Sequence, residues 1–213
     1  MALVATSSSV LYRLDRLRRF LVAWFVHSAN ALLYVGLVLT IGIASALYLI
    51  DTGTRLTTWH NGPWTMWFHT GQLGSDPYTR ARLAKIGALP LSSSVAATWE
   101  ARYDADGRRL HSSCEYVIES EAISATWFNI AVYDDQGLLI SNQADRYSFS
   151  SQTLATSPDG SFFISLARDA RPGNWLPVGG AGRLSLLMTI IEPQPTVADS
   201  ITQLPTIRRV DCR

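Results

Sequence analysis

The sequence contains few of the side chains that usually carry catalysis. A serine hydrolase needs an activated serine, a histidine base and an orienting carboxylate, yet no G-x-S-x-G motif occurs. His111 precedes Ser112 and Ser113, but adjacent residues on a strand point to opposite faces, so their proximity does not predict a dyad. His60 and His69 lack the neighbours of an H-E-x-x-H or C-x-x-C motif, which leaves open only a metal site assembled over long range. The sequence thus predicts no catalytic residues, no metal and no cofactor.

Six polar and aromatic residues are the best remaining candidates for a ligand site. An arginine among aromatic residues could bind a carboxylate or phosphate through its planar guanidinium, beside a polar and stacking wall. The alternative is structural: Arg146 pairs with Asp145 or Asp134 and pins a turn, while the wall residues fix a loop. Polar residues inside a sheet are more often satisfied structurally than catalytic, which favours the alternative. The six candidates are Asn129, Tyr133, Arg146, Tyr147, Asn174 and Trp175.

The elements that must position these residues read as short strands. Residues 127–133 suit a strand buried on both sides, 134–137 suit a turn, and 138–140 and 146–149 resume strand patterns. Short strands with turn residues between them predict an antiparallel β-sandwich or jelly-roll-like domain, mainly β. Further strands are expected at residues 95–103, 115–118, 161–166 and 183–191.

One short helix is predicted before these strands, over residues 78–86. Asp76 can cap its N-terminus, Pro77 suits its first position, and Gly87 suits the left-handed position after its end. Its basic residues are interpreted as a solvated face: Arg80, Arg82 and Lys85.

The N-terminal region predicts a membrane anchor. No acidic or basic side chain occurs between Arg19 and Asp51, and residues 31–50 are long enough as a helix to cross the roughly 30 Å hydrocarbon layer. The arginines before this span place the N-terminus in the cytoplasm and the rest outside the bacterial inner membrane, in the periplasm. A signal peptide cleaved near residues 44–46 is the alternative. Residues 20–30 either lengthen the helix or lie at the headgroups.

The chain is therefore divided into four parts. Residues 1–19 form a basic cytoplasmic segment, 20–50 the signal-anchor helix, 51–92 a tryptophan-rich segment with the short helix, and 93–213 the β-sandwich with an extended tail. The net charge of +1 indicates no nucleic-acid partner. The tryptophans near the span either lie at the membrane interface or pack on the domain. The candidates for contact with the membrane interface are Arg16, Arg18, Arg19, Trp59, Trp64 and Trp67.

Cys114 and Cys212 both fall in the exported part, where an oxidising compartment would allow a disulfide. The alternative is one buried thiol and one thiol at a frayed terminus. Cys212 ends a tail that contains Pro193, Pro195 and Pro205, which we expect to be an extended cover over the sheet rather than a regular element.

Several motifs together resemble the bacterial family of domain of unknown function (DUF) 1214. They are DPYTRARLAKIGALPL at 76–91, WFNIAVYDDQG at 127–137, RYSFSS at 146–151, DGS at 159–161 and NWLP at 174–177. The resemblance implies a β-sandwich-like domain that often occurs beside a second domain of unknown function, number 1254. That companion has no room in this sequence, so a separate partner protein that carries it is implied. The resemblance implies no agreed activity.

Three functions are expected from these observations. The first is a membrane-anchored periplasmic domain that binds a partner protein or an envelope ligand and is not an enzyme. The second is an envelope hydrolase of ester, amide or glycosidic bonds with a site around Arg146, Tyr147 and Asn174. The third is an accessory subunit of a larger membrane complex, in which the membrane helix itself makes protein contacts.

Overall fold

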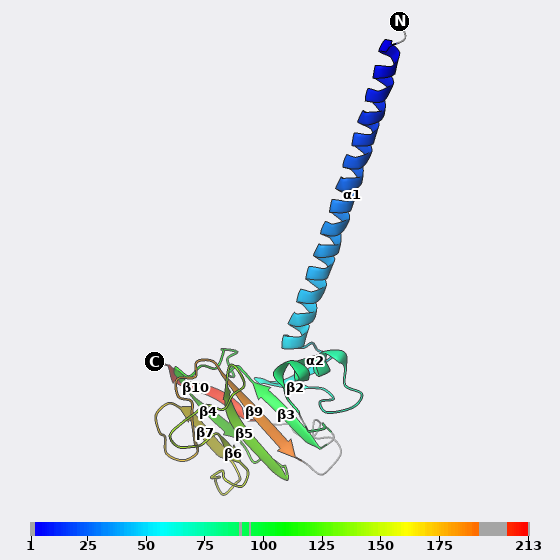
Figure 1. The fold of residues 1–213 in the computed structure, drawn as a ribbon. Coiled ribbons are helices and arrows are strands. Elements are labelled where there is room, and N and C mark those ends of the chain that lie inside the picture. Colours follow the sequence, from blue (N-terminus) through cyan, green and yellow to red (C-terminus); the bar gives the residue numbers. More distant parts are fainter. Residues whose placement is uncertain (1–2, 90, 94, 192–203, 213) are drawn as a thin grey trace. The chain divides into compact units, whose positions relative to one another are not determined.

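The computed structural model describes residues 3–89, 91–93, 95–191 and 204–212 (Figure 1). The chain forms two compact units, Met1–Asp51 and Thr52–Arg213. Helix α1 (Leu3–Thr52) makes up the first unit, and the second contains helix α2 (Pro77–Ile86) with ten strands in its described part.

Helix α1 is continuous over 50 residues. Residues 20–30 are therefore part of this helix, and their position relative to the lipid headgroups stays a prediction. Its segment Asp15–Thr52 is long and apolar enough to cross a membrane, and its 38 residues span roughly 57 Å at about 1.5 Å per residue. A membrane anchor and a signal sequence both contain such a helix near the N-terminus.

The second unit contains two sheets (Figure 1). The six-stranded sheet has the order β1 (Thr58–Asn61), β2 (Trp64–Trp67), β3 (Ala96–Ala101), β9 (Leu184–Ile191), β5 (Trp127–Asp134) and β6 (Ser148–Ser150). The four-stranded sheet has the order β10 (Thr206–Cys212), β4 (Cys114–Ser120), β7 (Phe162–Ala167) and β8 (Trp175–Pro177). Neighbouring strands are antiparallel except β7 and β8, which are parallel.

One hydrophobic core joins the two sheets. Burial alternates along β2, β4 and β9: in β9, Leu184, Leu186, Met188 and Ile190 are fully buried and the residues between them are half-buried. Side chains of both sheets belong to this single core, and it includes a Phe128–Phe162 stack whose ring centroids lie 5.6 Å apart. The predicted mainly-β, sandwich-like fold is thus confirmed.

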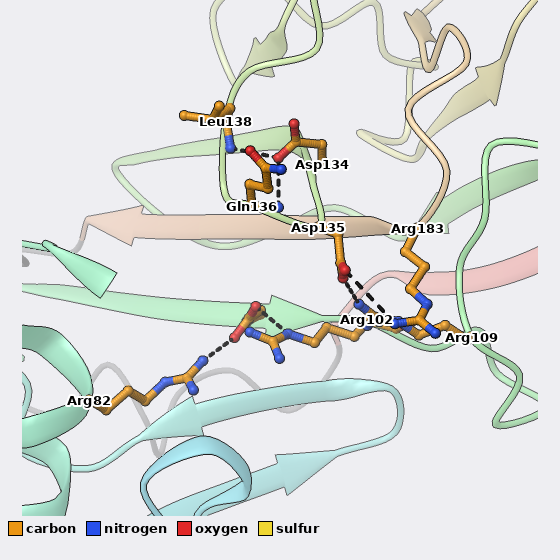
Figure 2. Close-up of polar contacts among 9 residues, drawn as sticks. Arg82, Arg102, Arg109, Asp134, Asp135, Gln136, Leu138 and Arg183 are labelled. Carbon is orange, nitrogen blue, oxygen red and sulfur yellow. Dashed lines mark hydrogen bonds and ion pairs between the residues drawn. The ribbon is translucent and has the colours of Figure 1, made fainter. Parts of the chain in front are cut away.

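Several strand assignments differ from the sequence-based expectation, since β1, β2, β8 and β10 were not expected and one expected strand is absent. Residues 138–140 form no strand, because β5 pairs with β9 and β6 instead and Leu139 makes only an isolated bridge to Tyr133. The turn before them does form, and Asp134 accepts hydrogen bonds from the N–H groups of Gln136 and Leu138 (Figure 2).

The C-terminal tail also differs from expectation. Its last part is the strand β10, which pairs with β4 and is therefore a regular element of the sheet rather than a loose cover. Ile207 of this strand is fully buried in the core. Pro193 and Pro195 lie outside the described residues.

Helix α2 has the predicted boundaries and caps. The Asp76 carboxylate accepts hydrogen bonds from the N–H groups of Tyr78 and Thr79 and from the Thr79 hydroxyl, at 2.5–3.0 Å. Gly87 adopts the left-handed conformation at φ 64° and closes the last turn. These caps stabilise a helix of only ten residues, which is too short to be stable in isolation.

Replacing Asp76 with alanine is expected to lower the free energy of unfolding by about 1 kcal/mol, because two N–H groups lose their acceptor. Asparagine is an equally good N-cap residue, so Asp76→Asn is expected to lose only a fraction of this. Chemical denaturation of the three proteins checks the order of stabilities.

The pH dependence of stability distinguishes the contribution of the charged Asp76 carboxylate from that of an uncharged N-cap residue. Partial burial tends to raise the pKa of Asp76, but the hydrogen bonds from Thr79 and Tyr78 outweigh it and hold this pKa below its ordinary value. The stabilisation is thus complete above the ordinary pKa of about 3.9 and is lost as the pH falls through the lower folded-state pKa. The free energy of unfolding of the wild type should approach that of Asp76→Ala in acid, because the carboxylate becomes protonated. The difference between Asp76→Asn and Asp76→Ala should not change with pH, because asparagine does not titrate. An equal decline of the two differences in acid would contradict this assignment.

Candidate functional site

A cavity of about 390 Å³ lies between helix α2 and the outer face of the six-stranded sheet. The wall of the sheet comes from alternate residues of β2, β3 and β9, whose other residues point into the core. The wall of the helix comes from Thr79, Arg82, Leu83 and Ile86, whose i, i+3, i+4, i+7 spacing places them on one face. The volume lies in the range of small-molecule sites.

The cavity is mainly apolar and contains one ion pair. Apolar side chains line most of it, and threonine hydroxyls add neutral polar groups. Arg82 and Glu100 are the charged residues among the described residues of its wall. The wall comprises Thr65, Trp67, Thr70, Thr79, Arg82, Leu83, Ile86, Ala88, Leu89, Leu91, Thr98, Glu100, Leu187 and Thr189.

Arg82 is the most distinctive group of the cavity. Its side chain is only 8% exposed, and its Nη2 atom lies 3.0 Å from Oε2 of Glu100. Its guanidinium lies 4.8 Å from the ring centroid of Trp67. The other oxygen of Glu100 accepts a 2.6 Å hydrogen bond from Nε of Arg102, so two guanidinium groups share one carboxylate (Figure 2).

This arrangement corrects the sequence-based interpretation of the helix. Arg82 does not belong to a solvated face: it is buried, whereas Arg80 and Lys85 are exposed. The helical spacing of Thr79, Arg82 and Ile86 was the signal in the sequence that these residues share one face of the helix. The contact with Glu100 could not be read in this way, because Glu100 is 18 residues from Arg82 and only the packing of α2 on the sheet brings them together.

The six predicted ligand-site residues lie in two separate groups. Asn129 and Tyr133 lie on the outer face of β5, where Asn129 is paired with Thr189 of the cavity wall. Asn174 and Trp175 lie at β8, in the other sheet. The structure thus brings part of the set close to the cavity and the rest elsewhere.

The second group makes structural contacts. Asn174 is 5% exposed and binds the backbone of Ala155 and Phe163 through three hydrogen bonds of 2.8–2.9 Å. Nε1 of Trp175 donates to the carbonyl of Ala167 at 3.0 Å, and Arg146 donates to the Trp175 carbonyl at 3.3 Å. These contacts fix loops against the sheet, as in the structural alternative.

Tyr147 is half-buried beside β5, where its carbonyl accepts a 3.3 Å hydrogen bond from the N–H of Val132. Its hydroxyl donates a 2.8 Å hydrogen bond to Asp145. That hydrogen bond raises the pKa of Tyr147 above its ordinary value, so the phenol keeps its proton at neutral pH. Asp145, which the sequence offered as a partner of Arg146, binds Tyr147 in this structure.

His111 and Ser113 do approach each other, at 2.8 Å between Nδ1 and Oγ. The argument from strand alternation does not apply here, because His111 makes only an isolated bridge to Arg183 and Ser113 lies in the turn that follows it. The N–H of Ser113 also donates to the same Nδ1 atom at 3.1 Å, which makes that nitrogen an acceptor in the turn. Among the described residues, no three His, Cys, Asp or Glu side chains gather as a metal site.

The tryptophans of the second unit are packed to different degrees. Trp64 is fully buried, and its Nε1 atom donates to the carbonyl of Pro205 at 2.6 Å. A buried side chain cannot contact lipid headgroups, so Trp64 packs on the domain instead. Trp59 is half-buried against Trp99 at 5.5 Å, and Trp67 lies beneath Arg82 in the cavity wall.

The two cysteines form a disulfide, Cys114–Cys212, between the paired strands β4 and β10. The bridge closes a sequence separation of 98 residues. It connects the C-terminal strand covalently to the sandwich.

Strands β3 and β9 of the cavity wall lie within residues 95–195, which match the model of a family described as a protein of unknown function. The matching family is DUF1214. The resemblance read from the sequence is thereby confirmed for these residues, while α2 precedes the matched region. The separate partner protein with the companion domain, number 1254, stays a prediction.

Two solved structures resemble this chain to different degrees. The VPA0106 protein from Vibrio parahaemolyticus has a TM-score of 0.57 at 19% identity, over 81% of this chain and 43% of that one. An uncharacterised protein from Burkholderia cenocepacia has a TM-score of 0.46 at 17% identity, over 79% and 41%. The match thus spans less than half the length of either protein. No curated protein matches it.

Proposed function

We propose that this protein is a membrane-anchored binding domain whose small, largely apolar ligand occupies the cavity between α2 and the sheet. The cavity carries the proposal, because a concave apolar site with a few convergent polar groups is the usual form of a small-molecule site. Helix α1 is the anchor. The arginine bias supports an N-terminus in the cytoplasm and a DUF1214 domain in the periplasm, held at the inner membrane.

Binding fits the lining of the cavity better than catalysis does. Its described wall contains no His, Cys, Ser or Lys side chain. Its two ionisable groups, Arg82 and Glu100, bind each other and hold the helix on the sheet. A general base or a nucleophile would need a different set of side chains.

Filling the cavity tests the proposal. Leu187→Trp places an indole in the cavity wall, and Leu138→Trp makes the same change on an exposed turn as a matched control. The full chain is extracted from its own membranes in an amphipathic polymer and weighed by native mass spectrometry. We expect the wild type and Leu138→Trp to carry a small-molecule adduct of about one per chain, and Leu187→Trp to lack it, since the ligand site is filled.

An adduct that Leu187→Trp retains, or its absence from the wild type, would contradict a ligand in this cavity. The same spectra address a second candidate function, assembly with a separate partner protein or a larger membrane complex. That candidate is favoured by the Vibrio protein, in which the matched fold occupies only 43% of the chain. Assembly requires a protein-sized adduct in stoichiometric amount.

A further inference from the structure

We propose that one end of the second unit lies on the surface of an anionic lipid bilayer and inserts exposed leucine side chains into it. This inference rests on the proposed function in one respect, because α1 must be the anchor that holds the domain at the membrane. It does not depend on the ligand cavity.

The strand register brings three connecting segments to the same end of the six-stranded sheet. Thr58, the first residue of β1, pairs with Trp67, the last residue of β2. Strand β2 is antiparallel to β3, so the end of β2 lies beside the start of β3. We call this end of the sheet the tether end, and it consists of residues 54–57, 68–76 and the described part of residues 86–95.

Hydrogen bonds join the segments of the tether end to one another. The N–H of Phe68 donates to the carbonyl of Thr57 at 2.9 Å. The N–H of Ser93 donates to the carbonyl of Thr70 at 2.9 Å. The side-chain amide of Gln72 donates to Oγ of the same Ser93 at 2.7 Å. The three segments therefore form one surface rather than independent loops.

The tether end has the most exposed apolar side chains of the second unit. Leu56 is 89% exposed, and Leu73 and Leu89 are fully exposed. In the rest of the described part of this unit, no large apolar side chain is more than 59% exposed. Apolar side chains that gather on an exposed surface mark a site of contact with a protein or a membrane. The exposed apolar residues of the tether end are Leu56, Leu73, Ile86, Leu89, Leu91 and Val95.

The reach of the chain favours the membrane as the partner. Leu56 is five residues after Asp51, which is the first charged residue after the apolar span. Five residues extend over at most about 18 Å, so an anchored α1 keeps Leu56 this close to Asp51 in every orientation of the domain. The six exposed residues are all aliphatic, whereas the centres of protein interfaces are enriched in aromatic residues.

The charges favour anionic lipids. Residues 51–95 contain four basic and two acidic residues, a net charge of +2, whereas residues 96–213 contain ten basic and fourteen acidic residues, a net charge of −4. The Arg82–Glu100 ion pair takes one charge from each part and leaves +1 and −3. Arg55 and Arg80 are exposed in the basic part. A basic segment beside a membrane is attracted to anionic headgroups.

The test is lipid quenching of a fluorophore on the full chain in nanodiscs that hold one chain each. An environment-sensitive fluorophore is attached to Leu56→Cys or Leu73→Cys, with Leu138→Cys on an exposed turn as the matched control. Cys114 and Cys212 form a disulfide, so the introduced cysteine is the thiol that reacts. The discs contain phosphatidylglycerol with or without brominated acyl chains, or phosphatidylcholine with the same chains.

We expect brominated phosphatidylglycerol to quench the fluorophore at positions 56 and 73 and not at 138, and phosphatidylcholine to quench less. With the fluorophore at position 56, Leu73→Ser should lower the ratio of docked to free domain at least about tenfold, and Leu138→Ser should leave it unchanged. Arg55→Gln together with Arg80→Gln should lower this ratio about 30-fold, because each basic residue strengthens binding to an anionic surface.

Absence of quenching at positions 56 and 73, equal quenching at 138, or no loss in the serine and glutamine variants would overturn the lipid surface. A blue shift without quenching would show that protein covers the leucines and would also overturn it. Leu187→Trp should keep the quenching, so failure of the cavity ligand leaves this surface standing. An intact mass that lacks α1 would overturn the anchor; the labelled shorter chain is then mixed with phosphatidylglycerol vesicles, where quenching would support the surface and its absence would overturn it.

Discussion

Removing the Cys114–Cys212 disulfide is expected to lower the free energy of unfolding by about 4 kcal/mol, the largest effect of any change considered for this domain. The bridge closes a loop of 98 residues of sequence separation, and so long a loop restricts the unfolded chain strongly. Strand β10 also lies at the edge of its sheet and pairs only with β4 among the described strands. Without the bridge, hydrogen bonds, the buried Ile207 and the Arg209–Asp104 ion pair remain to hold it.

The measurement is chemical denaturation of the double variant Cys114→Ser, Cys212→Ser beside the wild type. Both cysteines are replaced so that no lone thiol is left to form intermolecular bonds. The wild type in a reducing agent is the control and should unfold at the midpoint of the double variant. A loss below about 1 kcal/mol would show that the strand pairing suffices without the bridge.

Replacing Asn174 with alanine is expected to cost about 3 kcal/mol of stability and to leave ligand affinity unchanged. The side chain satisfies the N–H and C=O of Ala155 and the C=O of Phe163. A buried backbone group that loses its partner costs about 1–3 kcal/mol. In a domain of this size the melting temperature should fall by roughly 6–12 °C.

Thermal unfolding of Asn174→Ala checks the stability, and native mass spectrometry of the small-molecule adduct checks whether the cavity is still occupied. Asn129→Ala is the comparison, because Asn129 lies on the half-buried outer face of β5. If Asn174 instead belonged to a hydrolase site around Arg146, the variant would lose binding or turnover with little change in melting temperature. That result would restore the hydrolase as the better interpretation.

Much of the local structure could be predicted from the sequence. The caps of α2 were predictable because Asp76, Pro77 and Gly87 act on their own neighbours in the chain. The strands β3, β4, β5, β7 and β9 were found because runs of strand-forming residues are separated there by turn residues. Residues 138–140 have the same apolar character and form no strand, because β5 already pairs with β9 and β6.

Strands β1 and β2, which sequence reasoning missed, pair with each other, whereas the missed strands β8 and β10 depend on partners elsewhere in the chain. Strand β10 contains several charged residues and resembles a polar tail, but β4 supplies its hydrogen bonds. Strand β8 has three residues and forms only because it can pair in parallel with β7. A short strand has little structure of its own without a neighbouring strand.

The sequence by itself determined the long apolar helix, the caps of α2, the mainly-β class and the DUF1214 resemblance, because each depends on neighbouring residues or on a periodic pattern. The tertiary structure alone decided which cysteine and strand pairings form, and that Arg82 is buried against Glu100 beside a cavity. The physical reason is that packing brings together residues from distant parts of the chain. The identity of Arg82 in the sequence therefore does not reveal whether its side chain is exposed to water or buried beside a cavity.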